Sequence, residues 1–370
     1  MAGPAGAIAL TEAFETLPLL YARWIGELLG AGIPRERKAT CGTCAMCRPA
    51  DAAPHTEDHY FEPSAKCCTY LPRLPNFLAG GVLADPAAGP GQASVLSRIE
   101  TRAGVTPLGL SIPARYSVLY NAGDDLFGRA RGLICPHFVA ETADCGVWRH
   151  RNSVCATWFC KHERGRLGLR FWRGALQPLL ETLEAALAKW CVLELDLDVA
   201  ALEALADSAA WDGGEGRLTA AEIDGAPDPK AYARLWGRWL GREAECFERC
   251  AELVAGLSWP EVLAIGGPNA RARAMLTAEA FRRLVDPATP ERLRPAPVQV
   301  ARAGAGHVRL VSYSAYDPLE APAVTLALLP AFDGRPTAEV IAEVEAATGL
   351  SVEPGFVRKL ADFGVLTPEE

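Results

Sequence analysis

The chain has 370 residues, with 37 lysines and arginines against 45 aspartates and glutamates. That length allows two or three domains with their own cores, and a hydrophobic content of 50% excludes wholesale disorder. The formal net charge of −8 argues against general coating of nucleic acid, so we do not expect nucleic acid as a partner.

The cysteines are distributed unevenly, because nine of the 12 lie between Cys41 and Cys160. The N-terminal sequence has no charged region followed by an apolar one, so it does not predict a secretory signal. No apolar run is long enough to predict a membrane span. We therefore expect a cytoplasmic protein with no membrane partner. In that compartment, clustered cysteines are more often metal ligands than disulfides.

Helical and loop-rich segments alternate along the first 300 residues. Apolar residues at helical spacing predict an amphipathic helix over 11–29. From about 31 to 175 prolines and glycines recur and apolar runs are short, which predicts a loop-rich module organised by something other than a large core. Further on, the pattern predicts helices over 175–207 and 229–257, turns at 213–216 and 266–269, and a linker at 287–297.

The last 75 residues predict a small separate unit. An alternating apolar pattern at 308–312 predicts a strand. Thr337 is expected to cap a helix that Gly349 closes, and a further helix over 356–363 leads into a strand at 365–366. This order of elements is typical of a small winged-helix-type module.

The elements together predict a mainly α fold with small β content (α+β). We expect three parts: an N-terminal helix with a cysteine-rich metal-binding module in 1–175, a helical domain in 176–295, and a winged-helix-like partner-binding module in 296–370.

The first cysteine group is the run Cys41-x-x-Cys44-x-x-Cys47. Two-residue gaps allow successive thiolates to face one compact centre, and bacterial ferredoxins bind a [4Fe–4S] cluster with the same first run. The fourth cysteine of the ferredoxin run is missing here, so a more distant residue has to complete the site. The candidates are Cys67, Cys68 and Cys135.

The second group consists of Cys135, Cys145, Cys155 and Cys160, with two histidines next to it. The number of cysteines allows two four-cysteine sites, or one cluster and one zinc ion. His137 and His162 are possible ligands, although a packed or solvated histidine is the commoner case. His55 and His59 are weaker candidates of the same kind. The predicted metal and cofactor ligands are therefore Cys41, Cys44, Cys47, Cys67, Cys68, Cys135, Cys145, Cys155 and Cys160.

The remaining cysteines and the local charge have simpler interpretations. Cys246 and Cys250 share a helix face with apolar neighbours, so together with Cys191 they are expected in a helical core. Nine lysines and arginines against three acids lie between 129 and 173. This basic stretch would offset thiolate or cluster charge, bind an anion, or form a solvated face, and these interpretations stay open.

The second group also carries a family resemblance. The stretch from Cys135-Pro-His-Phe through Asp144-Cys145-Gly-Val-Trp148 to Arg151-Asn-Ser-Val-Cys155-Ala-Thr-Trp-Phe-Cys160 resembles the putative zinc- or iron-chelating CxxCxxCC family. That family includes the cysteine-rich part of flagellin lysine-N-methylases. Cys41, Cys44 and Cys47 with the doublet Cys67-Cys68 look like its N-terminal half, although here the doublet lies about twenty residues further on. The resemblance covers roughly 41–162 and implies a bound metal centre.

A second resemblance lies at the C-terminus. Leu329-Pro-Ala-Phe-Asp-Gly334, Thr337-Ala-Glu-Val-Ile341 and Leu360-Ala-Asp-Phe-Gly-Val-Leu366 resemble a small winged-helix peptide-binding domain. This resemblance implies that residues 300–370 hold a peptide or protein segment.

No motif identifies a catalytic residue, because the usual radical-SAM run, phosphate-binding loops, His-Glu-x-x-His and Gly-x-Ser-x-Gly are all absent. Our first hypothesis is a cytoplasmic protein with one or two iron–sulfur clusters, most simply [4Fe–4S], acting in electron transfer or cluster-dependent modification of a peptide or protein. One alternative is a zinc-stapled interaction protein without enzymatic activity. Another, by analogy with the family, is an S-adenosylmethionine-dependent protein methyltransferase.

Overall fold

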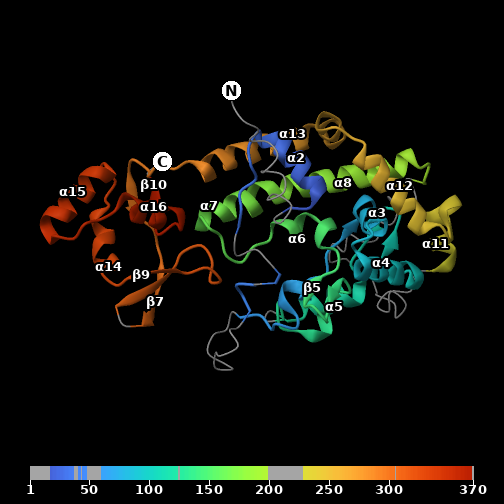
Figure 1. The fold of residues 1–370 in the computed structure, drawn as a ribbon, viewed down its shortest axis with the longest axis horizontal. Coiled ribbons are helices and arrows are strands. Elements are labelled where there is room, and N and C mark those ends of the chain that lie inside the picture. The colour runs from blue at the N-terminus through green and yellow to red at the C-terminus, as the bar shows by residue number, and fades with distance from the viewer. Residues whose placement is uncertain are drawn as a thin grey trace, which may run out of the picture. The chain divides into compact units, whose positions relative to one another are not determined.

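The computed structural model of the protein describes residues 17–36, 41–42, 44–47, 60–123, 126–198, 228–304 and 306–368. The described chain is mainly helical, and its strands form small sheets of two or three strands, as the sequence predicts (Figure 1). No helix in these ranges is long and apolar enough to cross a membrane.

Contacts group the chain into two compact units. Unit 1 comprises Met1–Arg35, Thr40–Trp158 and Leu176–Met275, and unit 2 comprises Glu36–Ala39, Phe159–Ala175 and Leu276–Glu370. The cysteine-rich segment before Trp158 therefore shares a unit with most of the predicted helical domain. Whether the three predicted parts act as separate domains stays a prediction.

Unit 1 contains most of the helices. Its two sheets have the strand orders β1-β3-β2 and β4-β5, and all their pairings are antiparallel. Its elements are α2 (Leu19–Leu29), η1 (Lys66–Thr69), β1 (Leu74–Pro75), α3 (Asn76–Ala84), α4 (Gly89–Thr101), β2 (Val105–Thr106), β3 (Gly109–Leu110), α5 (Ala114–Asn121), η2 (Arg131–Leu133), β4 (Phe138–Val139), β5 (Asp144–Cys145), η3 (Trp148–His150), α6 (Ser153–Thr157), α8 (Gln177–Glu194), α11 (Pro229–Trp236), η5 (Gly237–Trp239), α12 (Glu243–Ala255) and the first part of α13 (Trp259–Val285).

The most extensive helix contact among the described residues of unit 1 is between α3 and α12 (Figure 1). A Cβ atom placed on Gly80 of α3 would lie 1.8 Å from the backbone oxygen of Phe247 in α12. Only glycine permits this approach, because any side chain would force the helices apart. This contact packs the cysteine-rich segment against the helical core of unit 1. Residues 31–175 also contain the helices α3, α4 and α5. The expectation of a loop-rich module organised by something other than a large core is therefore corrected.

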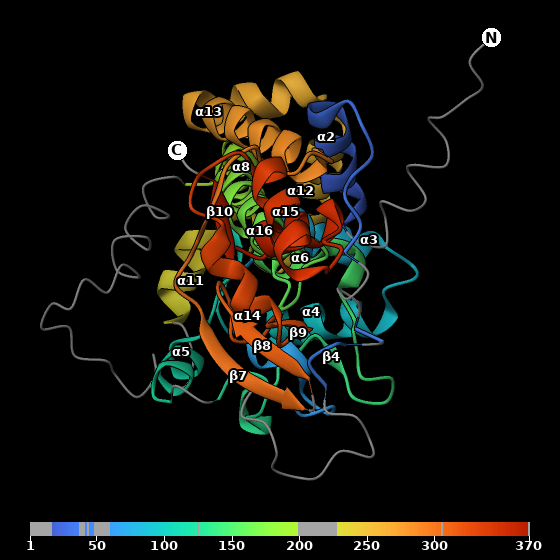
Figure 2. The same cartoon turned by 90° about the vertical axis from the view of Figure 1, so that its left-hand side faces the viewer.

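Unit 2 is a smaller α/β arrangement. It contains α7 (Gly165–Leu169), the π-helical turn η4 (Arg170–Leu176, whose last residue belongs to unit 1), the end of α13, β6 (Leu293–Pro295), β7 (Gln299–Gly304), β8 (His307–Val311), β9 (Leu319–Pro322), α14 (Thr325–Leu328), η6 (Leu329–Ala331), α15 (Thr337–Thr348), α16 (Pro354–Asp362) and β10 (Leu366–Pro368). Strands β7, β8 and β9 form an antiparallel meander (Figure 2). Strand β10 pairs with β6.

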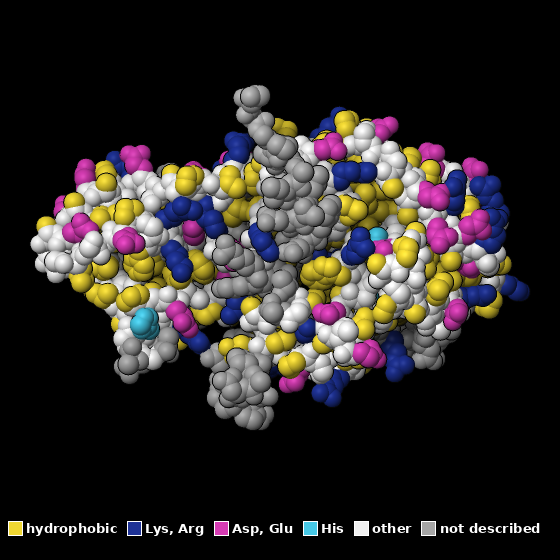
Figure 3. Space-filling model, viewed as in Figure 1, with side chains coloured by type: hydrophobic (Ala, Val, Ile, Leu, Met, Phe, Trp, Pro, Cys, Tyr) yellow, Lys and Arg dark blue, Asp and Glu magenta, His cyan; other side chains and the backbone are white. Residues whose placement is uncertain are grey.

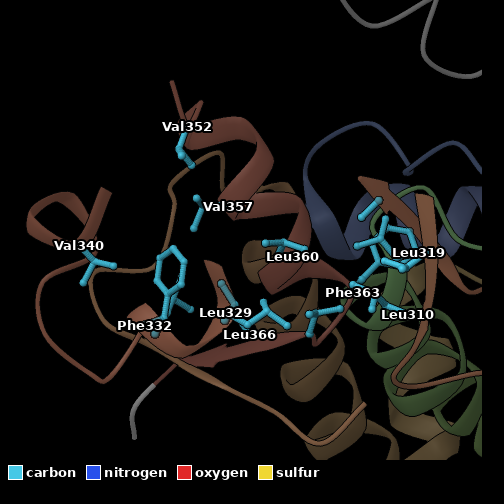
Figure 4. Close-up of a cluster of buried hydrophobic side chains, with 14 residues drawn as sticks. Leu310, Leu319, Leu329, Phe332, Val340, Val352, Val357, Leu360, Phe363 and Leu366 are labelled. Atoms are coloured by element: carbon cyan, nitrogen blue, oxygen red, sulfur yellow. The ribbon is translucent and has the colours of Figure 1, made fainter. Parts of the chain in front are cut away.

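Aliphatic and aromatic side chains hold unit 2 together. Figure 4 shows Phe332, Val357 and Leu360 among the members of one buried cluster, drawn from the strands as well as from α15 and α16. Leu310 and Leu366 are fully buried in the same cluster. Burying such side chains is the dominant favourable term in folding, so unit 2 has a conventional hydrophobic core.

Several predicted boundaries differ from the observed ones. The helix predicted over 229–257 is interrupted, because Gly237 and Gly241 take positive φ angles of 48° and 77° between α11 and α12. The turn predicted at 266–269 is a kink inside α13, at Gly267 and Pro268. The linker predicted at 287–297 contains β6.

The ends of the predicted helices can be compared with the observed ones. Gly349 closes α15 in the left-handed conformation, as predicted. Thr337 is not the helix cap: it is the first helical residue, and its hydroxyl donates to the Pro290 carbonyl at 2.8 Å. The helix predicted over 11–29 is observed from Leu19, after Pro18, and the predicted turn at 213–216 lies outside the described residues.

Candidate metal centre

The turn that carries the Cys67-Cys68 doublet is held by a buried lysine. Lys66 has a positive φ of 50°, which is unfavourable for a residue with a side chain. Its ammonium group donates to the carbonyl oxygens of Cys41 and Ala143. The side chain is buried despite its charge, so Lys66 fastens two cysteine-bearing segments to the doublet.

The Cys135 segment lies against the same turn. The Cys135 amide donates to the Cys68 carbonyl at 2.7 Å. Three residues later the chain enters the β4–β5 hairpin, in which Phe138 pairs with Cys145. The His137 amide donates to the Cys135 thiol, and the Gly146 amide donates to the His137 carbonyl at 2.7 Å. Hairpin and turn therefore hold Cys135 and Cys145 in one region.

Cys155 is positioned by the start of a short helix. Asn152 is the N-cap of α6, and its side-chain oxygen accepts from the Cys155 amide at 3.0 Å. Arg151, directly before this cap, is 4% exposed. Its guanidinium carbon lies 3.3 Å from the centre of the Trp148 ring. A buried cation thus lies next to the cysteine of α6.

The thiols of these segments are near enough to influence one another. Burial raises the pKa of Cys41 to about 12, and the charges of Cys67 and Cys145 add to this effect. Burial likewise raises the pKa of Cys135 to about 12 and that of Cys155 well above its usual value. Cys67 contributes to the shift of six other thiols, which are Cys41, Cys47, Cys68, Cys135, Cys145 and Cys155.

Cys67 differs from its neighbours because its pKa is lowered, not raised. The Cys68 thiol donates to Cys67, which is the main reason that the pKa of Cys67 is lowered to about 7, and Arg151 and Lys66 add to this. Hydrogen bonding to the charged form of a group favours that form. The doublet therefore combines one thiol whose pKa is lowered with one whose pKa is raised by its neighbour.

Arg151 faces four thiols of this group. Its charge interacts with Cys145, Cys41, Cys155 and Cys67, although burial is the main cause of its own lowered pKa. A guanidinium removed from water is unfavourable unless negative charge lies near it. The region is therefore arranged to accept negative charge on its sulfur atoms.

All twelve cysteines are free thiols. Among the described residues, no group of three cysteine, histidine, aspartate or glutamate side chains is already arranged to hold a metal ion. The donor set nevertheless fits a metal centre in its chemistry, because iron–sulfur clusters and zinc both take thiolate ligands and both benefit from nearby cations. A site for a metal is often completed only when the metal binds.

The other predicted ligands have different environments. Cys44 and Cys47 are hydrogen-bonded to each other, and burial raises the pKa of Cys47 to about 12. Cys160 belongs to unit 2, where it interacts with Arg173. Cys191, Cys246 and Cys250 are fully buried in unit 1. His55 and His59 lie outside the described residues.

Both candidate histidines are buried. His137 and His162 are each 2% exposed, and burial lowers the pKa of each to about 4. In unit 2, the carboxylate of Asp317 accepts from the His162 amide at 2.9 Å and from the Tyr313 hydroxyl. His162 therefore belongs to a buried polar group in unit 2, although its Nε2 atom has no hydrogen-bond partner among the described residues.

The members of the basic stretch have different local environments. Arg151 is buried among thiols, and Arg149 pairs with Asp85 at 3.5 Å in unit 1. In unit 2, Arg164 pairs with Asp362 at 2.6 Å. On α12, ion pairs join arginines to glutamates, and Figure 3 shows basic and acidic side chains intermixed over α11 and α12.

Two buried groups near the cysteines were not predicted from the sequence. Lys66 was missed because nothing in its neighbourhood predicts a left-handed lysine. Glu184 of α8 is also buried, and it accepts hydrogen bonds from Tyr21 and from the amide and hydroxyl of Ser153 at 2.6 and 2.7 Å. Burial raises its pKa to about 7. The sequence signal that could have identified Glu184 is its position on the apolar side of a predicted helix.

No family model, curated protein or solved structure matches this chain.

Proposed function

We propose that unit 1 binds an iron–sulfur cluster, most simply [4Fe–4S], and that the protein acts in electron transfer or in cluster-dependent modification of a peptide or protein. The observation that carries the proposal is that hydrogen bonds join the cysteine-bearing segments: Lys66 donates to the Cys41 and Ala143 carbonyls, and the Cys135 amide donates to the Cys68 carbonyl. The charges of four cysteines from four separate segments, Cys41, Cys67, Cys145 and Cys155, also interact with the guanidinium of buried Arg151.

The same four cysteines are the ligands that the charge distribution favours. Cys135 and Cys68 lie next to them, and Cys44 and Cys47 interact with each other, with Cys67 also acting on Cys47. The wider set leaves room for a second centre. Bound to such ligands, a cluster supplies one-electron transfer at a potential set by its surroundings.

The chain's own residues have defined tasks in this proposal. Arg151 offsets the negative charge of deprotonated thiols in a buried region, and Lys66 holds the Cys41 and Ala143 segments against the doublet. Nearby cations lower the pKa of a thiol and therefore the pH at which it can bind metal. Loading should therefore depend on Arg151 even though it offers no sulfur.

The partner is expected at unit 2. Strand β7 lies at one edge of the β7-β8-β9 sheet, and its Val300 side chain is 49% exposed. An extended peptide adds to such an edge through main-chain hydrogen bonds. This gives the proposed partner-binding role of residues 300–370 a specific form.

The test is the metal and sulfide content of anaerobically purified protein. We expect a brown protein with absorption near ~400 nm and with iron and acid-labile sulfide in comparable amounts. Cys145→Ser should lose most of both. Cys250→Ser is the matched control, because it changes a fully buried thiol in the same unit and should keep its iron.

Other outcomes have definite meanings. Stoichiometric zinc without sulfide, in a colourless protein, would reject the cluster and support a zinc-stapled interaction protein. Equal loss of iron from Cys145→Ser and Cys250→Ser would reject the assignment of ligands to the thiols around Arg151.

A further inference from the structure

The side chain of His137 has an unusual hydrogen-bonding position. It is 2% exposed, and its Nδ1 atom lies 2.7 Å from the Ser94 hydroxyl oxygen of α4. Its Nε2 atom is buried and has no hydrogen-bond partner among the described residues. A buried polar atom without a partner is rare in folded proteins and calls for an explanation.

The contacts of Ser94 favour one tautomer of the His137 ring. The Ser94 hydroxyl has one hydrogen, and the Gly91 carbonyl oxygen, which can only accept, lies 2.7 Å from the hydroxyl oxygen. With the hydrogen on that carbonyl, the hydroxyl oxygen accepts from the ring, and in this arrangement Nδ1 of His137 carries the proton. Nε2 then holds a lone pair.

The backbone of His137 is fixed among the proposed ligands. Its amide donates to the Cys135 thiol, and its carbonyl accepts from Gly146, the residue after Cys145. Helix α4 approaches the same place: a Cβ atom on Gly91 would lie 2.3 Å from the Gly146 carbonyl oxygen. His137 is thus held between two cysteines and the helix that sets its tautomer.

We infer that His137 is a nitrogen ligand of the metal centre in unit 1, binding through Nε2, with Ser94 as the residue that positions it. This rests on the proposed function and deepens it, because the centre then has a mixed sulfur and nitrogen ligand set. A ligating histidine usually donates its other N–H to a fixed acceptor, which sets the tautomer and the ring orientation. Ser94 is such an acceptor here.

His150 provides the contrast within unit 1. Its Nε2 atom lies 3.0 Å from an Asp85 carboxylate oxygen, so that atom is already occupied. His150 and His137 therefore differ in the property that matters for ligation, which is whether Nε2 already has a hydrogen-bond partner. His150→Ala is the matched control for His137→Ala.

The experiment uses the full chain, reconstituted anaerobically with ferrous iron and sulfide and then reduced. Pulsed electron paramagnetic resonance is recorded on protein with natural and with nitrogen-15 histidine. We expect a directly coordinated nitrogen whose coupling changes with the isotope, in wild type and in His150→Ala. His137→Cys should keep its iron and sulfide but lose this coupling, which also answers the objection that His137→Ala fails to fold.

The positioning role of Ser94 has its own readout. Ser94→Ala should weaken iron retention against a chelator about 10–100-fold, the usual effect of removing a partner of a ligating histidine. Ser97→Ala, at an exposed position of the same helix, should leave retention unchanged.

The outcomes separate the two proposals. A wild-type cluster without a histidine coupling, or a coupling that survives in His137→Cys, would overturn the His137 assignment and leave the cluster in place. Failure of the wild type to take up iron and sulfide would overturn both.

Discussion

Unit 1 contains cysteines in two contrasting environments. Around Arg151 the thiols lie on turns, a hairpin and the start of a short helix, next to buried cations. Cys191, Cys246 and Cys250 lie instead on α8 and α12, fully buried, and the charged groups near Cys246 are the acids Glu243 and Glu245. Burial and neighbouring thiols raise the pKa of a cysteine in both places, but among the described residues the cations that act on the thiols belong to the first place. The environment, and not the residue type, separates a candidate ligand from a packing residue.

The largest expected effect concerns the contact between α3, in the cysteine-rich segment, and α12, which carries Cys246 and Cys250. Gly80→Ala should destabilise the protein by about 3 kcal/mol or more, because the new methyl group would overlap the Phe247 carbonyl between α3 and α12. Denaturant unfolding measures the change. Gly89→Ala is the control, because nothing lies within 4 Å of its Cβ position. An unchanged unfolding midpoint for Gly80→Ala would contradict the close α3–α12 contact.

The buried carboxyl group of Glu184, which accepts hydrogen bonds from Ser153 of α6, makes the stability of the protein depend on pH. The folded-state pKa of Glu184 is raised to about 7 from an ordinary value of 4.5. The folded protein therefore binds this proton more tightly than the unfolded chain does. The stabilisation is complete below about pH 4.5 and is lost as the pH rises through 7, with a total of about 3 kcal/mol.

The measurement for Glu184 is unfolding free energy between pH 4 and 8. Glu184→Gln should lack this part of the pH dependence, whereas Glu181→Gln, at an exposed position of α8, should retain it. The same slope in Glu184→Gln and wild type would show that another group is responsible. Burial also raises the pKa of Glu36 in unit 2 to about 7. Its contribution to the pH dependence should be the same in wild type and in Glu184→Gln.

The role of the Arg151 cation can be tested without changing any cysteine. Arg151→Met should leave the metal-free protein equally stable or up to about 1–4 kcal/mol more stable, because an apolar side chain replaces a buried charge. Its iron content should fall. Arg149→Met, at a side chain that is 59% exposed, is the control. Full iron loading of Arg151→Met would contradict the role assigned to the guanidinium.

The smallest expected effect concerns the helix-core thiols. Cys250→Ala should destabilise the metal-free protein by about 1 kcal/mol, since it deletes one buried heavy atom from a packed core. Cys145→Ala, at a half-buried position, should cost less in the same denaturation measurement. The reverse order would remove the distinction between packing and ligand cysteines.

Much of the fold follows from local patterns in the sequence. The mainly helical class, α8 with its buried leucines and the Gly349 helix end are predictable because each depends on residues close together in the chain. The helices in 76–121 were missed because α3 is apolar on most of its surface and α5 has no buried residue, so neither shows a clear amphipathic face.

The candidate site is predictable in composition but not in arrangement. Spacing alone selects the cysteines, yet it cannot show that Cys160 belongs to unit 2 or that Arg151 faces four thiols. Likewise, the unpartnered Nε2 of His137 depends on Ser94, which lies 43 residues earlier. Contacts of this kind are set by tertiary packing and leave no periodic signal.

The two carbonyl contacts of Lys66 also bear on the order of folding. They join residues that lie 25 and 77 positions away in the chain. Closing loops of this length requires conformational entropy to be given up before the contact is gained. During synthesis the second contact has to wait until Ala143 has left the ribosome, so the doublet turn is joined to the hairpin that carries Cys145 only after both have been made. A nascent chain therefore passes through a period in which its cysteine-bearing segments are not yet assembled.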